Sequence, residues 1–268
     1  MIKRKLAVQL YSLREFSEKD FGKVLEDVAA MGYIGVEPAV SLYGMTPAQF
    51  KKRIADLGME MCSSHYPWCR TPDDMSQVID LAGELGLTQI VCGYGPDDFA
   101  DLDAIKRTAD KTNAMIEKAK AAGLAMFQHN HYWEFERING ELKYDIYFKY
   151  CPDIRLQLDS FWSMSLGAND PAEMMKHCAD RVYLLHMKDG LRRQREEKER
   201  VVKGTFDRKI ELNPLGDGEM DIPSILEVTP ARVDTIIVEL DYCTIEMHEA
   251  LKRSYDYLVR IGAGYGSK

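Results

Sequence analysis

The chain has 268 residues, of which 46% are hydrophobic and 29% are charged. This composition suits a globular protein with a substantial core and argues against a disordered chain. The 43 acidic and 35 basic residues give a formal net charge of −8, which argues against nucleic acid as a partner because no general positive field attracts phosphates.

The cysteines and the N-terminal stretch favour a cytoplasmic protein. The six cysteines show no Cys-x-x-Cys spacing, and several lie in apolar runs, where a thiol simply packs. Gln9, Arg14 and Glu15 interrupt the first apolar run before the core of a signal peptide can form. No run approaches the ~20 apolar residues of a membrane span. We therefore expect a reducing compartment and no membrane contact.

In the first half of the chain, short apolar runs alternate with stretches of helical period, which is typical of βα units. Thr46-Pro47 and Thr71-Pro72 each combine a cap with a proline suited to a first helical turn. Glycines near the ends of the periodic stretches indicate helix C-termini. The predicted strands are 6–12, 33–38, 60–65 and 89–95, and the predicted helices are 21–32, 48–58, 73–86 and 101–123.

The second half continues the alternation with two irregular connections. Residues 132–144 follow the fifth strand, and Asn139-Gly140 within them predicts a small hairpin insertion. Residues 190–219 follow the seventh strand and form a long, charged loop, which is either a solvated surface or a lid. The predicted strands are 124–131, 154–161, 182–189 and 235–241, and the predicted helices are 170–181, 222–228 and 247–262.

Eight βα units predict an α/β fold, a single (β/α)8 TIM barrel that spans residues 1–268 as one domain. An open doubly wound sheet also alternates strands and helices. The count of eight and the lack of a GxGxxG motif after the first strand favour the closed barrel.

Four side chains at the ends of the last four barrel strands could bind one divalent cation: His129, Asp159, His186 and Glu239. Parallel strands of a barrel end at one rim, so these side chains should converge there. Two imidazoles and two carboxylates suit manganese, cobalt, iron or zinc, with magnesium less favoured because it prefers oxygen. For any one residue the alternative is a strand-end side chain that only forms hydrogen bonds.

Residues near the fifth strand leave two choices open. His129 and His131 point the same way along a strand, and we favour His129 as the ligand because it lies deeper, with His131 as a substrate contact. Glu134 could serve as a general base if burial raises its pKa. The alternative is that Glu134 pairs with Arg137 on the hairpin.

Further polar and aromatic residues at the rim indicate a site for a sugar or polyol. Polar groups around a cation could bind hydroxyls, and aromatic faces could stack on a sugar ring or else close the top of the core. The candidate substrate residues are Glu37, His65, Trp68, His131, Trp133 and Trp162, with Lys188 and Asp241 at the same rim.

The motifs QLYSLR, HNHYWEF, LDSFW, LHMKD, LGDGEMD and VELDYC occur in this order from Gln9 onward. Together they resemble the sugar phosphate isomerase/epimerase superfamily, the xylose isomerase-like TIM barrels, which include tagatose and psicose epimerases, hydroxypyruvate isomerase and inosose dehydratase. The resemblance covers nearly the whole chain. It implies a divalent metal, often manganese, at His129, Asp159, His186 and Glu239, and association into homo-oligomers. His129 stands where that family has a glutamate.

The resemblance implies an isomerase or epimerase that removes a proton next to the carbonyl of a keto sugar or polyol and forms an enediolate. Because His129 replaces one of two glutamates, Glu239 is expected to act with Glu134 or a histidine, while Lys188 or His65 stabilises charge on the substrate. Alternatives are a lyase, either inosose dehydratase-like or eliminating a keto-glycoside, and a non-catalytic sugar-binding barrel. A class II apurinic endonuclease would need more metal ligands and a basic rim.

Overall fold

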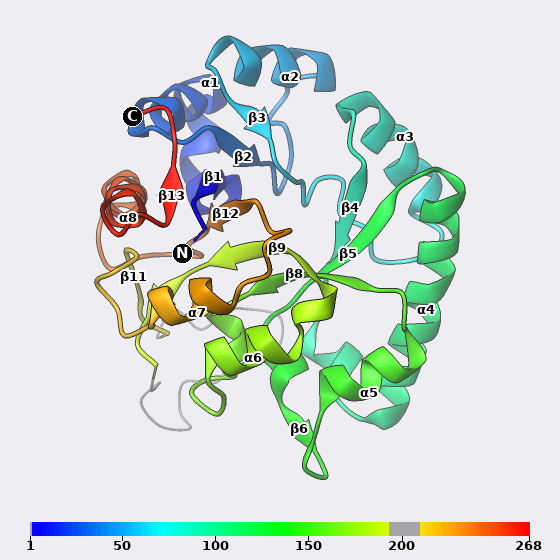
Figure 1. The fold of residues 1–268 in the computed structure, drawn as a ribbon. Coiled ribbons are helices and arrows are strands. Elements are labelled where there is room, and N and C mark those ends of the chain that lie inside the picture. Colours follow the sequence, from blue (N-terminus) through cyan, green and yellow to red (C-terminus); the bar gives the residue numbers. More distant parts are fainter. Residues whose placement is uncertain (1, 193–209) are drawn as a thin grey trace.

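A computed structural model describes residues 2–192 and 210–268, and its centre is a parallel sheet with eight strands along its main path. This sheet curls into a barrel (Figure 1). The sheet order is β3-β2-β1-β12-β9-β8-β5-β4. Ala7 of β1 lies opposite Ile237 of β12, so the first and last units are neighbours, and the predicted barrel is confirmed. The strands are β1 (Arg4–Gln9), β2 (Gly35–Glu37), β3 (Glu60–Met61), β4 (Gln89–Cys92), β5 (Ala125–His129), β8 (Arg155–Asp159), β9 (Val182–Met187) and β12 (Thr235–Val238).

The seam between β3 and β4 closes the barrel. The chain runs beyond β3 without regular pairing until Cys69 forms a parallel bridge with Cys92. The neighbouring Trp68 packs on Gly93, where a Cβ atom would lie 2.7 Å from the indole. A glycine is therefore required at this contact, and the seam depends on packing more than on strand hydrogen bonds.

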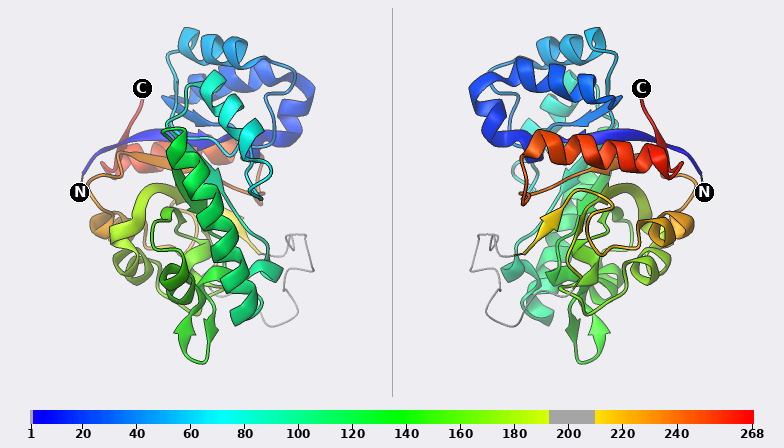
Figure 2. Two further views of the ribbon diagram at one scale, coloured as in Figure 1. Left: turned by 90° about the vertical axis from the view of Figure 1, so that its right-hand side faces the viewer. Right: turned by 90° about the vertical axis from the view of Figure 1, so that its left-hand side faces the viewer.

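Eight helices among the described residues cover the outside of the barrel, and α1 and α8, from opposite ends of the chain, lie side by side (Figure 2). Their apolar faces pack on the sheet, as at Val24 and Leu25 of α1 and Leu251 and Leu258 of α8. None of the described helices is long and apolar enough to cross a membrane. The helices are α1 (Arg14–Met31), α2 (Pro47–Asp56), α3 (Met75–Leu85), α4 (Leu102–Ala121), α5 (Lys143–Tyr150), α6 (Pro171–His177), α7 (Ile222–Val228) and α8 (Met247–Arg260).

Two helix starts show how local sequence sets the boundaries. Thr46 caps α2 as predicted, and Gln49 completes a capping box with it. The prediction that Thr71-Pro72 starts α3 is wrong. The Asp74 carboxylate accepts the backbone N–H groups of Arg70 and Thr71, at 3.3 and 2.9 Å, so this segment forms a turn and α3 begins at Met75.

Two small antiparallel pairs lie outside the barrel sheet. Strands β6 (Arg137–Ile138) and β7 (Glu141–Leu142) form a hairpin that projects from the barrel (Figure 2), with positive φ at Asn139 and Gly140 in its turn. After β9, β10 (Asp189–Gly190) pairs with β11 (Leu212–Asn213). Most of the predicted charged loop, residues 193–209, lies outside the described residues. A short terminal strand, β13 (Gly264–Tyr265), pairs with β1.

Candidate metal centre and its cavity

Side chains from four strand ends meet at the rim of the barrel. His129 ends β5, Asp159 ends β8, His186 lies near the end of β9, and Glu239 directly follows β12. Each offers a ligand atom, and these atoms lie within 4.8 Å of one another in a buried cluster. Metal–ligand bonds of about 2.1 Å place neighbouring ligand atoms roughly 3–4 Å apart, so the cluster is close to the size that a single cation needs.

A buried ammonium group connects the carboxylates of this cluster. The Lys188 Nζ lies 2.9 Å from Asp159 Oδ2, 3.0 Å from Glu239 Oε2 and 2.9 Å from Asp241 Oδ2. Burial alone would lower the pKa of Lys188, but these three carboxylates raise it well above the usual value. Burial would likewise raise the pKa of Glu239, but Lys188 and His186 hold it well below the usual range. Lys188 and Glu239 therefore form a charged pair inside the protein.

His186 lies between two carboxylates. Its Nδ1 is 2.6 Å from Glu239 Oε2, and its Nε2 is 2.8 Å from Glu37 Oε1. Burial would lower the pKa of His186, but Glu37 and Glu239 raise it to about 10. Without a cation, both ring nitrogens therefore carry protons.

The cluster carries a net negative charge, which attracts a divalent cation. Glu37, Asp159, Glu239 and Asp241 supply four negative charges, and Lys188 and His186 supply two positive ones, which leaves two negative charges before a cation binds. A cation that binds His186 Nδ1 displaces its proton and so leaves the protein groups with three negative charges. Burial raises the pKa of Asp159 to about 6, which still leaves its carboxyl mainly ionised at neutral pH. The number, type and charge of these donors fit one divalent metal ion.

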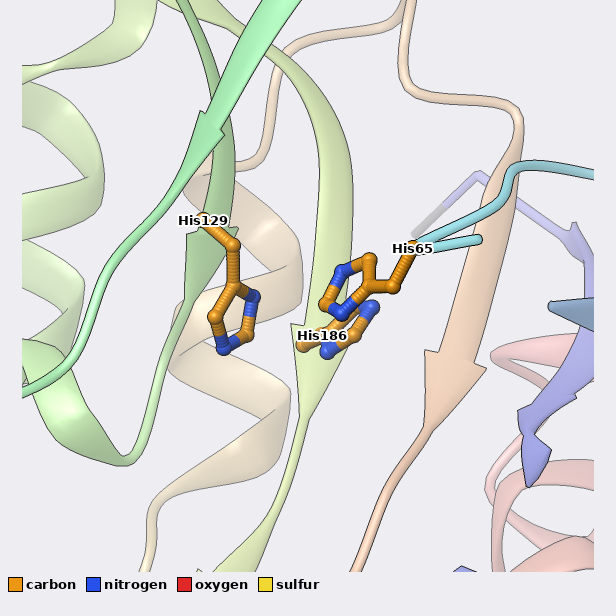
Figure 3. Close-up of side chains that lie close together, drawn as sticks. All are labelled: His65, His129 and His186. Atoms are coloured by element: carbon orange, nitrogen blue, oxygen red, sulfur yellow. The ribbon is translucent and has the colours of Figure 1, made fainter. Parts of the chain in front are cut away.

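A cavity of about 810 Å³ opens beside this cluster. His129, Glu239 and Asp241 are among the residues that line it. Four predicted substrate residues line it as well, namely His65, Trp68, His131 and Trp133. The rings of His131 and Trp133 stack at 4.4 Å, and the rings of His65 and Trp68 lie 5.0 Å apart. Figure 3 shows the rings of His65, His129 and His186 turned toward a common space.

Glu134 and Trp162 lie away from the cavity. Glu134 is fully buried in the turn after β5, where its Oε2 accepts the His131 backbone N–H at 2.9 Å. Burial raises the pKa of Glu134 to about 8. Arg137, its alternative partner, donates instead to the Gly140 carbonyl. Trp162 is buried with its ring 5.4 Å from the Lys188 Nζ, and neither Trp162 nor Glu134 lines the cavity.

Comparison with known proteins identifies the family of this fold. The sequence model of the xylose isomerase-like TIM barrel family matches residues 25–258. The chain belongs to this family. No curated protein matches it at a significant level.

Several solved structures have a similar fold over nearly the whole length of this xylose isomerase-like chain. A sugar phosphate isomerase/epimerase from Parabacteroides distasonis is 22% identical, with a TM-score of 0.76 and 96% of this chain and 98% of that chain covered. An L-ribulose 3-epimerase is 16% identical, with a TM-score of 0.67 and coverage of 97% and 94%. A probable 3-DHS dehydratase from Bacillus anthracis is 12% identical, with a TM-score of 0.71 and coverage of 95% and 98%.

Two residues that contact the centre of this xylose isomerase-like barrel were missed by the sequence analysis. Gln9 and Gln157 are fully buried, and both donate to the Glu37 carboxylate. Glu37 itself was predicted to bind substrate, but it contacts His186 and does not line the cavity. A signal was present in the sequence, because Gln157 interrupts an apolar strand two residues before Asp159 and so shares its face.

Proposed function

We propose that the protein is a metal-dependent isomerase or epimerase that removes a proton next to the carbonyl of a keto sugar or polyol and forms an enediolate. The observation that carries the proposal is the convergence of His129, Asp159, His186 and Glu239 beside the cavity. A cation held there, manganese or else cobalt, iron, zinc or magnesium, would polarise the substrate carbonyl and acidify the adjacent C–H group.

The residues around the cavity have roles in this proposal that follow from their charge or from their aromatic rings. Glu239 faces the cavity, and Lys188 keeps its carboxylate ionised, the form that accepts a proton. Burial lowers the pKa of His131 to about 3, so its imidazole is neutral and can form hydrogen bonds with sugar hydroxyls. Trp68 and Trp133 line the wall on which a sugar ring can stack.

A second candidate is a lyase that eliminates a β-hydroxyl or glycosyl group from the same enediolate. One observation favours it: His129 occupies the first ligand position and Glu134 lies away from the cavity, so among residues 2–192 and 210–268 no second glutamate of the candidate ligand set faces Glu239. Inversion of a carbon needs acid–base groups on both faces, whereas elimination can use a single base. The cavity also extends to Arg70, Asp97 and Lys111, and its volume falls in the range of about 300–1,000 Å³ found for drug-sized ligands, so it has room for a glycoside.

The test is metal analysis of the purified protein, followed by proton NMR of keto sugars, inososes and keto-glycosides in deuterated water. We expect one bound metal ion per chain and loss of a C–H signal in one compound class, with the product distinguishing isomerisation from elimination. Glu239→Gln should slow the exchange by about 10²–10⁴-fold, whereas Glu249→Gln on the surface of α8 should not. Bound metal without any exchange would instead support a non-catalytic sugar-binding barrel.

A further inference from the structure

A layer of buried polar side chains lies directly beneath the candidate metal centre. Gln9 ends β1, Glu37 ends β2, and Gln157 lies two residues before Asp159 on β8. All three are fully buried and none lines the cavity. Burying an amide or a carboxylate is unfavourable unless it is hydrogen-bonded, so the partners of these groups indicate what the layer does.

Gln157 determines which nitrogen of His129 carries a proton. Its Nε2 donates to Glu37 Oε2 at 2.6 Å, so its Oε1 faces the other way. That oxygen lies 3.1 Å from His129 Nδ1 and 2.5 Å from His65 Nε2. An amide oxygen only accepts hydrogen bonds, so both of these ring nitrogens must donate. In the neutral ring of His129 the remaining nitrogen, Nε2, is then unprotonated and able to bind a cation.

Glu37 has the same relation to His186. Its Oε1 accepts from His186 Nε2 at 2.8 Å, and Gln9 and Gln157 hold the carboxylate in place from below. The other ring nitrogen, Nδ1, faces the candidate ligand Glu239 at 2.6 Å. A cation between Nδ1 and Glu239 would take the place of the proton now shared there, while the contact between Nε2 and Glu37 remains.

We propose that Glu37 and Gln157 are positioning residues, which hold His186 and His129 with Nδ1 and Nε2, respectively, directed at the cation. The inference rests on the proposed function only in requiring that the cluster binds metal. A carboxylate or amide behind a ligating imidazole fixes the ring's tautomer and orientation and makes it a better donor. Glu37 thus acts on the metal through His186 and does not contact substrate.

The test measures Co²⁺ binding to the metal-free full chain by calorimetry and by the visible absorption of the bound ion. We expect Glu37→Gln and Gln157→Leu each to weaken Co²⁺ binding by about 10–100-fold and to change the absorption spectrum. Gln128→Leu is the matched control, because Gln128 is equally buried and adjoins His129 but faces the opposite side of β5. Its Co²⁺ affinity should stay within about twofold of the unaltered protein's if the layer acts as described.

A second measurement separates positioning from a general loss of structure. Long-range proton–nitrogen NMR of the metal-free protein should show His129 with its proton on Nδ1, and Gln157→Leu should shift that proton while thermal unfolding stays cooperative. Unchanged affinity in both layer variants, with normal Co²⁺ binding by the unaltered protein, would overturn this inference alone. Failure of the unaltered protein to bind Co²⁺, Mn²⁺ or Zn²⁺ would overturn both the inference and the proposed function. If Glu37→Gln does not fold, Gln157→Leu and Glu37→Asp test the same contacts.

Discussion

Lys188 carries a buried positive charge that three buried carboxylates surround. A single substitution at this residue therefore tests how much the charge contributes to the stability of the fold. Its Nζ lies within 3.0 Å of Asp159, Glu239 and Asp241. Replacement by methionine keeps the shape of the side chain but leaves the three carboxylates without the ammonium group that they share. Because breaking a buried ion pair costs about 3–5 kcal/mol, we expect Lys188→Met to lower the free energy of unfolding by this amount in urea titrations with a chelator present.

The matched control for this prediction is Lys143→Met. Lys143 is also mostly buried, but it has a half-exposed partner, Glu136, at 2.7 Å. An ion pair in contact with water contributes little, so this variant should lose about 1 kcal/mol or less. Equal losses in the two variants would show that the three carboxylates do not depend on Lys188.

Glu134 gives a prediction about pH. Burial raises its pKa to about 8 in the folded protein, compared with ~4.3 in an unfolded chain. Between these values the folded state holds a proton that the unfolded state has lost, so the free energy of unfolding falls as pH rises, by about 1.4 kcal/mol per pH unit. We expect Glu134→Gln to remove this slope, so that its stability relative to the unaltered protein rises by about 2 kcal/mol from pH 6 to 7.5.

Chemical denaturation at several pH values checks this expectation, with Glu136→Gln as the control. Glu136 is half exposed and paired with Lys143, so its variant should keep the slope. A Glu134→Gln variant with the same pH dependence as the unaltered protein would show that Glu134 is ionised at neutral pH.

At the scale of elements, the seam between β3 and β4 depends on the contact of Trp68 with Gly93. A Cβ atom at position 93 would lie 2.7 Å from the indole. Overpacking of this kind typically costs 1–3 kcal/mol, so Gly93→Ala should destabilise the barrel by about this much and move Trp68 into the cavity. Thermal unfolding and tryptophan fluorescence measure the two effects.

Gly83→Ala is the control for the seam. Gly83 lies within α3, and nothing lies within 4 Å of the place where its Cβ would be. Alanine favours a helix interior over glycine by about 1 kcal/mol, so this variant should be slightly more stable. A Gly93→Ala variant as stable as Gly83→Ala would mean that the seam tolerates a wider separation.

The elements differ in how far the sequence could predict them. Strands β5, β8, β9 and β12 were predictable because long apolar runs end in polar residues, and the same runs placed the four candidate ligands at one rim. The start of α3 was not predictable, because the Asp74 carboxylate accepts a backbone N–H group of the preceding turn and so holds that segment out of the helix. Nor could the sequence place Glu134, whose side chain turns away from the cavity to the backbone of His131. Side-chain direction in an irregular connection depends on tertiary packing that no periodic pattern encodes.

At the scale of the whole molecule, the candidate centre joins strands that are far apart in the sequence. Glu37 on β2 contacts His186 on β9, and Lys188 links the end of β8 to the segment after β12. Glu37, Lys188 and the four candidate ligands therefore draw on five of the eight strands or on the segments that follow them. A ligand that binds only the assembled cluster should for this reason stabilise the folded barrel as one unit.

Metal addition tests this coupling. A cation present at 100 times its dissociation constant stabilises the folded state by about 2.7 kcal/mol, which for a domain of this size raises the unfolding midpoint by about 5–10 °C. We expect this rise in thermal scans of the metal-free protein, and its loss in Asp159→Asn, which removes one candidate ligand. Asp145→Asn is the control, because Asp145 pairs with His177 at 2.6 Å near the surface and away from the cluster; it should keep the full rise. The same rise in Asp159→Asn would place the stabilising metal elsewhere, because a cation bound in the cluster loses both a ligand and a negative charge in this variant.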